Sequence, residues 1–422
     1  MHAILFFIYF ALLCLLIKKI KFFRDSEIRL SWLLVFFTLR VLASCINTWL
    51  AEKYFPNQRD IWSYFREGLV MKGDLLRAPL HCFKTLLPPF NEFSFFDMHS
   101  SWYLLEFKFI SGINTFFDFL SFDNFYINSL LFSFFVYWGS IALFRVFRNI
   151  LHNNGLLCSL LSLLIPSTLF WTACINKEGV IYMSLGFFSY YLHRALTERP
   201  NWRLIVACIL FLALGLFSRP FLIFGLFPFI LFWIAGEKIP FSIPAVAALT
   251  LIVILIVYYF IGTFYPNADP FLIISDRQQD ILVMSGRSRI HLPSLEPNPG
   301  SFLAILPTAF LNGFIEPLPG HGGHPIYLLM TLEMLAIWTI ILTAVSRKFF
   351  RTPKVRMGVY DISCLFMAIP CILLAGYSTP FISSISRYRS IYLPFLLVPF
   401  VHTLSGLPFV SKINKSLSKI IA

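Results

Sequence analysis

The chain has 422 residues, of which 58% are hydrophobic and 13% are charged, and phenylalanine alone occurs 50 times. Soluble domains carry about twice that charged fraction, so the composition excludes an ordinary soluble enzyme and predicts a polytopic helical membrane protein. The apolar runs lack the alternating pattern of barrel strands, which excludes a transmembrane barrel. The net charge of +13 is explained by basic loops at the inner membrane face, so we expect no nucleic-acid partner.

Long apolar runs recur from one end of the chain to the other and predict about eleven transmembrane helices. We expect a single all-α transmembrane domain over residues 1–422, with a first outer loop at 51–124 and a second at 263–324. The first loop is rich in aromatic residues in broken apolar pieces, which predicts interfacial amphipathic helices. The predicted spans are 3–17, 30–50, 125–144, 156–173, 179–192, 204–217, 221–235, 241–262, 325–345, 359–377 and 391–404.

The basic clusters give the predicted topology. Lys18, Lys19 and Lys21 follow the first span, and placing them in the cytoplasm brings every later basic cluster to the same side. Both long loops then fall outside. The sequence therefore predicts a multi-pass protein with its N-terminus outside and its C-terminus in the cytoplasm.

Charged residues at tight junctions between apolar runs are the first candidates for a site. Lys177 and Glu178 join two apolar, aromatic runs, and Arg219 stands in Ser218-Arg219-Pro220. Such charges are expensive in a membrane unless they line a cavity or do chemistry. The alternative interpretation is a surface turn with paired or snorkelling ions. Arg387 and Arg389 before the last span suit either an anionic ligand or lipid headgroups.

Three carboxylates on the predicted outer face are candidate general bases or metal ligands: Asp60, Glu178 and Glu316. His321 and His324 lie three residues apart in a glycine-rich turn, which is a weak metal signal and leaves substrate binding open. The metal site is therefore unknown. No cofactor is required by any motif, and a divalent cation stays open.

The order of these residues resembles the multi-spanning GT-C-type glycosyltransferases of bacterial envelope polysaccharide biosynthesis. The resemblance rests on an acid after an early helix, the stretch Pro166 to Glu178, the Arg219-Pro220 turn, Asn312 to Pro319 with Glu333, and Ser386 to Pro394. The chain departs from the pattern beside Asp60, where many members carry two adjacent acids and this sequence has Arg59 and Ile61.

The resemblance implies a glycosyltransferase at the outer face of the bacterial inner membrane. Its donor would be a polyprenyl-phosphate-linked sugar, and its acceptor an envelope glycan or lipid. The resemblance implies Asp60 as the general base or metal ligand, and in our working hypothesis Glu178 or Glu316 is catalytic if Asp60 is not. The resemblance also implies that Lys177, Arg219, Arg387 and Arg389 bind the lipid phosphate, and the two histidines of the glycine-rich turn, His321 and His324, complete the predicted substrate-binding residues. Two alternatives stay open: a repeat-unit polysaccharide polymerase or ligase, and a lipid-linked glycan transporter or flippase, for which Arg40 in mid-span is the best argument.

Overall fold

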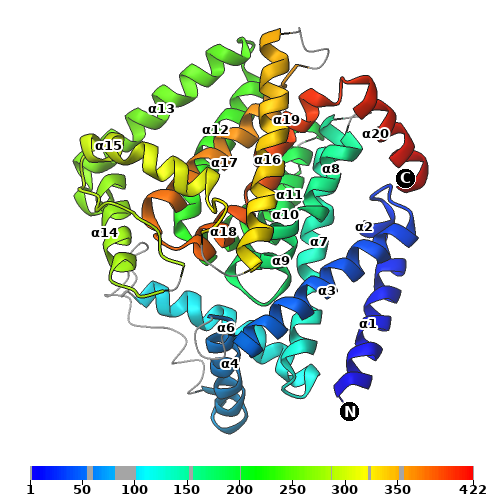
Figure 1. The fold of residues 1–422 in the computed structure, drawn as a ribbon. Helices are drawn as coiled ribbons and strands as arrows, with labels where there is room; N and C mark the ends of the chain where they lie inside the picture. Colours follow the sequence, from blue (N-terminus) through cyan, green and yellow to red (C-terminus); the bar gives the residue numbers. More distant parts are fainter. Residues whose placement is uncertain are drawn as a thin grey trace. The chain divides into compact units, whose positions relative to one another are not determined.

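The computed structural model describes residues 2–54, 60–80, 101–151, 155–199, 201–286, 288–321, 325–350 and 356–421 (Figure 1). Within these ranges the chain is almost entirely helical, and seven helices are long and apolar enough to cross a membrane, or eight if one bent pair counts as a span. The prediction of an all-α, multi-pass membrane protein is confirmed at this level, and the count of eleven stays a prediction. The seven are His2–Lys19, Leu30–Tyr54, Phe125–Leu151, Pro220–Lys238, Ile243–Phe264, Pro325–Arg347 and Val359–Ser378.

Contacts divide the chain into two compact units. The first comprises Met1–Phe147, Ser162–Pro220 and Ser416–Ala422, and the second comprises Arg148–Leu161 and Phe221–Lys415. The helices of the first unit are α1 (His2–Lys19), α2 (Lys21–Arg24), α3 (Leu30–Tyr54), α4 (Asp60–Arg77), α6 (Ser101–Ser121), most of α7 (Phe125–Leu151), α9 (Pro166–Ala173), α10 (Lys177–Thr197) and α11 (Trp202–Ser218).

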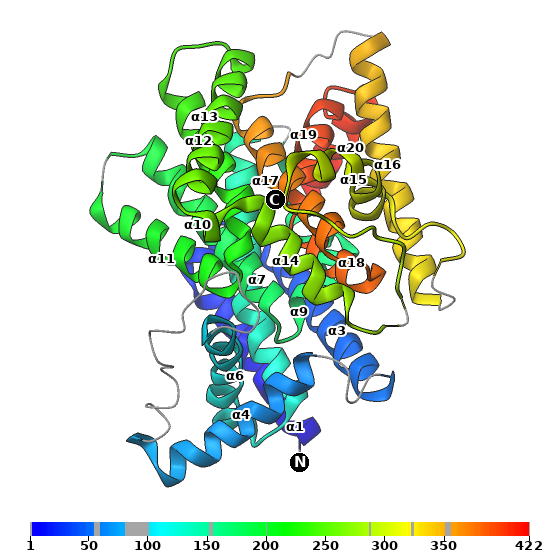
Figure 2. The same ribbon diagram turned by 90° about the vertical axis from the view of Figure 1, so that its left-hand side faces the viewer.

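Helix α7 is the most deeply buried of the seven helices that could cross a membrane. The rings of Phe23 and Phe37 pack on Tyr137, with centroids 5.6 and 5.5 Å from its ring, so aromatic contacts join α2, α3 and α7 in this core. Helix α10 crosses α7 so closely that a Cβ on Gly186 would lie 2.1 Å from the Gly139 carbonyl oxygen. Helices α10 and α11 lie side by side as a hairpin (Figure 2).

The segment 51–124 contains two helices, α4 and α6, which pack together along their length. They lie side by side in both views (Figures 1 and 2). Their contact is tight at Gly68, where a Cβ would meet the Asn114 side chain at 2.8 Å. Helices were predicted in this segment, and their position at the membrane interface stays a prediction.

The second unit has its own aromatic core, in which Trp233 and Phe229 of α12 pack against Tyr360. Its helices are most of α8 (Gly155–Leu164), η3 (Pro220–Leu222), α12 (Ile223–Lys238), α13 (Ile243–Phe264), η4 (Pro266–Ala268), α14 (Pro270–Leu282), α15 (Pro299–Phe310), the π-helix η5 (Leu311–Ile315), α16 (Pro325–Phe350), α17 (Val359–Ser378), α18 (Ile382–Ser390), α19 (Leu393–Leu404) and most of α20 (Pro408–Ile421).

Proline explains a difference between the predicted and observed helices. The run 156–173 was predicted as one span, but it is two helices, because Pro166 forces Ile165 into an extended conformation (φ −62°, ψ 119°). The chain also bends by 112° between α19 and α20, so the basic tail is a separate helix.

Candidate functional site

The junction before α10 is held from two sides within the first unit. Arg40 of α3 donates through Nη2 to the carbonyl and hydroxyl oxygens of Thr172, both at 2.7 Å. Ser133 of α7 donates to the carbonyl of Ala173 at 2.6 Å. These bonds satisfy the end of α9, and the Arg40 cation there also complements the helix dipole. The bonds fix the extended chain that leads to Lys177.

Two ion pairs meet at the start of α10. The Lys177 ammonium lies 2.5 Å from Oε2 of Glu106, and Nη2 of Arg219 donates to Oε1 of Glu178 at 2.8 Å. The two side-chain carboxylates are 8% and 1% exposed, and the cations are 12% and 18% exposed. We call these four residues the ionic cluster. It brings together three predicted site residues (Lys177, Glu178 and Arg219) and adds Glu106.

Local sequence places each member of the ionic cluster. Asn176 caps α10 and accepts from the Lys177 backbone, so Glu178 stands in the first turn, where the helix dipole favours an acid. Pro220 ends α11 and leaves Arg219 extended at its C-cap, which frees the guanidinium to reach α10. Glu106 comes from the second turn of α6.

The surroundings of Glu106 tune its charge. Burial raises the pKa of this carboxyl, and the nearby Lys177 and Arg219 cations partly oppose the rise. The indole Nε1 of Trp102 donates to Oε1 at 3.1 Å, while the Lys177 ammonium also stacks on the Tyr103 ring at 4.8 Å. A buried carboxyl with a raised pKa beside two cations can accept a proton once an anion draws the cations away.

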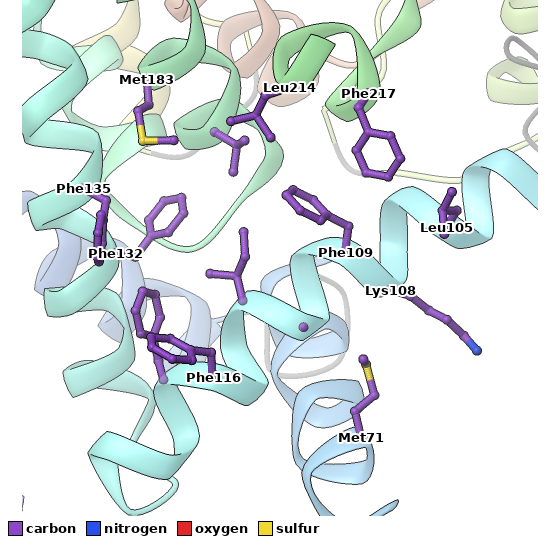
Figure 3. Close-up of a pocket in the computed structure, with 14 residues that line it drawn as sticks. Met71, Leu105, Lys108, Phe109, Phe116, Phe132, Phe135, Met183, Leu214 and Phe217 are labelled. Atoms are coloured by element: carbon purple, nitrogen blue, oxygen red, sulfur yellow. The ribbon is translucent and has the colours of Figure 1, made fainter. Parts of the chain in front are cut away.

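An apolar pocket lies in the first unit, and part of its lining comes from α6, α10 and α11, the helices of the ionic cluster, although none of the four cluster residues lines it. Its volume is about 570 Å³, and its lining includes Leu105 and Phe217, which neighbour Glu106 and Arg219 along the chain. Aromatic rings dominate it (Figure 3), and the one charged residue, Lys108, turns its ammonium away from the space. The remaining lining residues are Met71, Phe109, Gly112, Ile113, Phe116, Phe117, Phe132, Phe135, Val180, Met183 and Leu214. Ions beside an apolar space suit an amphiphilic ligand with an anionic head.

The second unit contains a polar cavity of about 740 Å³, which Glu316 and His321 line. Oε2 of Glu316 lies 2.9 Å from Nδ1 of His321 and accepts from the Leu318 backbone at 2.9 Å. The π-helix just before it brings Asn312 to the same wall, and π-helical turns are frequent at functional sites. The other lining residues are Ser288, Arg289, Ile290, His291, Pro307, Thr308, Leu311, Gly320 and Ile382.

Arg389 is hydrogen-bonded to the backbone of the segment that carries Glu316. It is 2% exposed, and its Nη1 donates to the carbonyls of Gly313 and Glu316 at 3.0 and 2.7 Å. Burial lowers its pKa to about 10, so the guanidinium stays charged at neutral pH, and Glu333 and Glu316 favour that charge. Arg387 lies over the Tyr388 ring at 5.2 Å.

The other predicted residues are placed as follows. Asp60 begins α4 with an exposed side chain, and the adjacent Ile61 packs with Cys174 in a buried cluster. His324 lies outside the described residues. Arg40, whose mid-span position was the sequence argument for a transporter, donates hydrogen bonds to Thr172 at the end of α9. Among the described residues, no group of three or more His, Cys, Asp or Glu side chains is placed to hold a metal ion.

Glu106 is the residue that sequence reasoning missed. It lies in the 51–124 segment in Leu104-Leu105-Glu106-Phe107, and a carboxylate flanked by apolar residues on an amphipathic helix was the available signal. Comparisons of the chain with protein-family models, with curated proteins and with solved structures found no match.

Proposed function

We propose that this chain is a GT-C-like membrane glycosyltransferase that takes a sugar from a polyprenyl-phosphate carrier. The ionic cluster beside the apolar pocket carries the proposal, because it offers two cations for a phosphate and an apolar space for a lipid chain. Buried ion pairs contribute little net stability, so a role in ligand binding gives the cluster a reason to exist. The acceptor would be an envelope glycan or lipid at the outer face of the bacterial inner membrane.

The proposed reaction needs only groups that the first unit holds. The carrier phosphate binds Lys177 and Arg219, which loosens their pairing with Glu106 and Glu178. An acceptor hydroxyl gives its proton to Glu106 as its oxygen bonds to the anomeric carbon of the sugar. The bond between that carbon and the phosphate oxygen breaks, and the electron pair stays on the phosphate. Both cations neutralise that charge, which is where electrostatic catalysis is strongest.

Other assignments of the proton acceptor belong to the same proposal. Asp60 is the base that the family resemblance implies, and Glu178 is the second carboxylate of the ionic cluster; both belong to the first unit. A well-placed base contributes about 10²–10⁴-fold. The single changes Glu106→Gln, Asp60→Asn and Glu178→Gln therefore identify the base, since only loss of the base lowers transfer by that factor while the lipid stays bound.

The test is transfer of radiolabel from a polyprenyl-phosphate sugar in membranes that contain each variant. The paired change Arg219→Ala with Glu178→Gln removes the charges together and should lower transfer at least 100-fold. The control is Arg194→Ala with Glu198→Gln, which removes a solvent-exposed ion pair at the C-terminal end of α10. This change should leave transfer unchanged. Equal transfer by wild type and the cluster variant would refute the proposal.

The two alternatives give different products. A polymerase or ligase would move a whole repeat unit, so its product would lengthen by several sugars at each step. If the protein is a flippase, the cluster variant should keep the wild-type level of sugar transfer and lose translocation of the lipid-linked glycan.

A further inference from the structure

Helix α20 carries two stripes on opposite sides. Lys412, Lys415 and Lys419 are spaced three and four residues apart, and all three side chains are exposed. Val410, Ile413 and Leu417 have the same spacing, displaced by two residues. Two residues correspond to about 200° around an α-helix, so the stripes face away from each other. This is the pattern of a helix that lies in a membrane interface.

The length and direction of α20 argue against a membrane span formed by this helix alone. The helix has 14 residues, which is shorter than the ~20 that a span requires, and it bends by 112° away from α19 (Figure 1). Asn414 is buried, and its Oδ1 accepts from the backbone of Leu157 at 3.1 Å, so α20 is docked at the start of α8 in the second unit. This hydrogen bond connects α20 to α8.

Two exposed features remain for a partner. The Phe409 side chain is 73% exposed at the first turn, beside the apolar stripe. No ion pair among the described residues involves the three lysines, so their charge is available. Phe409 and Lys412 are three residues apart, so they lie about 60° apart around the helix and Phe409 flanks the row of lysines. An exposed aromatic side chain beside a row of cations complements the surface of a bilayer with anionic headgroups.

We propose that α20 is a membrane-surface anchor that binds anionic phospholipid headgroups through Lys412, Lys415 and Lys419. Phe409 enters the boundary between headgroups and acyl chains, and the lysines contact lipid phosphates, while the half-buried apolar stripe lies on the side of the docked Asn414. Each basic residue near an anionic surface strengthens attachment about fivefold. The anchor is independent of the proposed transfer reaction.

The test is hydrogen–deuterium exchange of residues 408–419 in the full chain. The protein is placed in nanodiscs of phosphatidylcholine, or of phosphatidylcholine with about one third phosphatidylglycerol. We expect exchange to slow at least tenfold in the anionic discs, and the slowing to fall as sodium chloride is raised, because salt screens surface charge. The salt series needs no variant and therefore does not depend on how a variant folds.

In the triple variant Lys412→Gln, Lys415→Gln, Lys419→Gln, residues 408–419 should exchange at the same rate in both lipids. The control removes three exposed cations elsewhere, Lys53→Gln, Arg66→Gln and Arg77→Gln, and should keep it. Equal exchange in both lipids for wild type would overturn the proposal, as would slowing that persists in the lysine variant. Slowing that depends on protein concentration and not on lipid would assign the surface to a second copy of the chain.

Discussion

Lys177 occupies a position where an α-helix disfavours a cation. The first turn of a helix carries a partial positive charge, so an ammonium there needs compensation. Glu106 and the Tyr103 ring provide it, both from α6. For Glu178 the situation is reversed. The helix N-terminus favours its negative charge, but burial of the carboxylate costs free energy, and the Arg219 cation compensates that cost. Each ion therefore depends on a partner from a different helix.

This dependence predicts an asymmetry between single and paired changes. Arg219→Ala leaves Glu178 buried without its cation and should lower the free energy of unfolding by about 3 kcal/mol. Adding Glu178→Gln should restore most of the loss, since an uncharged amide replaces the buried carboxylate. Thermal unfolding in detergent measures both. A single variant as stable as the paired one would show that the ion pair has no structural role.

Asp118 of α6 gives a second prediction at this scale. Its side chain is buried, Asn128 donates to it at 2.5 Å, and burial raises the pKa of Asp118 to about 6. The folded pKa exceeds the ordinary value of 3.8, so the protonated form stabilises the fold below about pH 4, and this stability is lost as pH rises through 6.

Asp118→Asn should therefore raise the unfolding midpoint at pH 8 and change it little at pH 4. The expected gain at pH 8 is on the order of 1 kcal/mol after allowance for solvent screening. Unfolding curves across pH 4–8 measure the effect. If wild type and variant show the same dependence on pH, Asp118 is not the titrating group.

At the scale of elements, glycine sets how closely α7 and α10 approach. A Cβ on Gly139 would lie 2.5 Å from the Cα of Met183, and one on Gly186 would lie 2.1 Å from the Gly139 oxygen. Small residues that allow backbones to meet are a common way for membrane helices to associate. Because α10 begins at Lys177, this crossing also positions the ionic cluster.

Gly186→Ala should consequently destabilise the protein by about 1–3 kcal/mol, since backbone atoms on both sides cannot move aside. Gly73→Ala is the matched control: a Cβ there meets nothing within 4 Å, so this change in α4 should stabilise by about 0.5–1 kcal/mol. Thermal unfolding compares the two variants. A neutral result for Gly186→Ala would contradict the close crossing.

Features that depend on neighbouring residues could be predicted from the sequence, whereas contacts between residues far apart in the chain could not. Long apolar runs such as Ile243–Phe264 could be predicted from sequence, because spanning a membrane depends on local composition. The break at Ile165 was also encoded locally by Pro166, yet the continuous hydrophobicity around it concealed it. Glu106 could not be assigned to Lys177, since 71 residues separate them and only the packing of α6 brings them together.

At the scale of the molecule, each unit has its own aromatic core and its own polar feature. The first holds the ionic cluster beside an apolar pocket, and the second holds the Glu316–His321 pair in a polar cavity. Sequence order alone grouped the residues of both features into one site. The pairing of Lys177 with Glu106 and of Arg219 with Glu178 inside the first unit is what the structure adds, and it makes the ionic cluster the proposed position of the carrier phosphate.

The most direct measurement is the affinity of the purified protein for a polyprenyl phosphate, determined by native mass spectrometry. Wild type should bind the lipid. The paired variant Arg219→Ala with Glu178→Gln should bind it at least tenfold more weakly, and the exposed-pair control at Arg194 and Glu198 should match wild type. Undiminished binding by the paired variant, or no binding by wild type, would contradict a carrier-phosphate site at the ionic cluster.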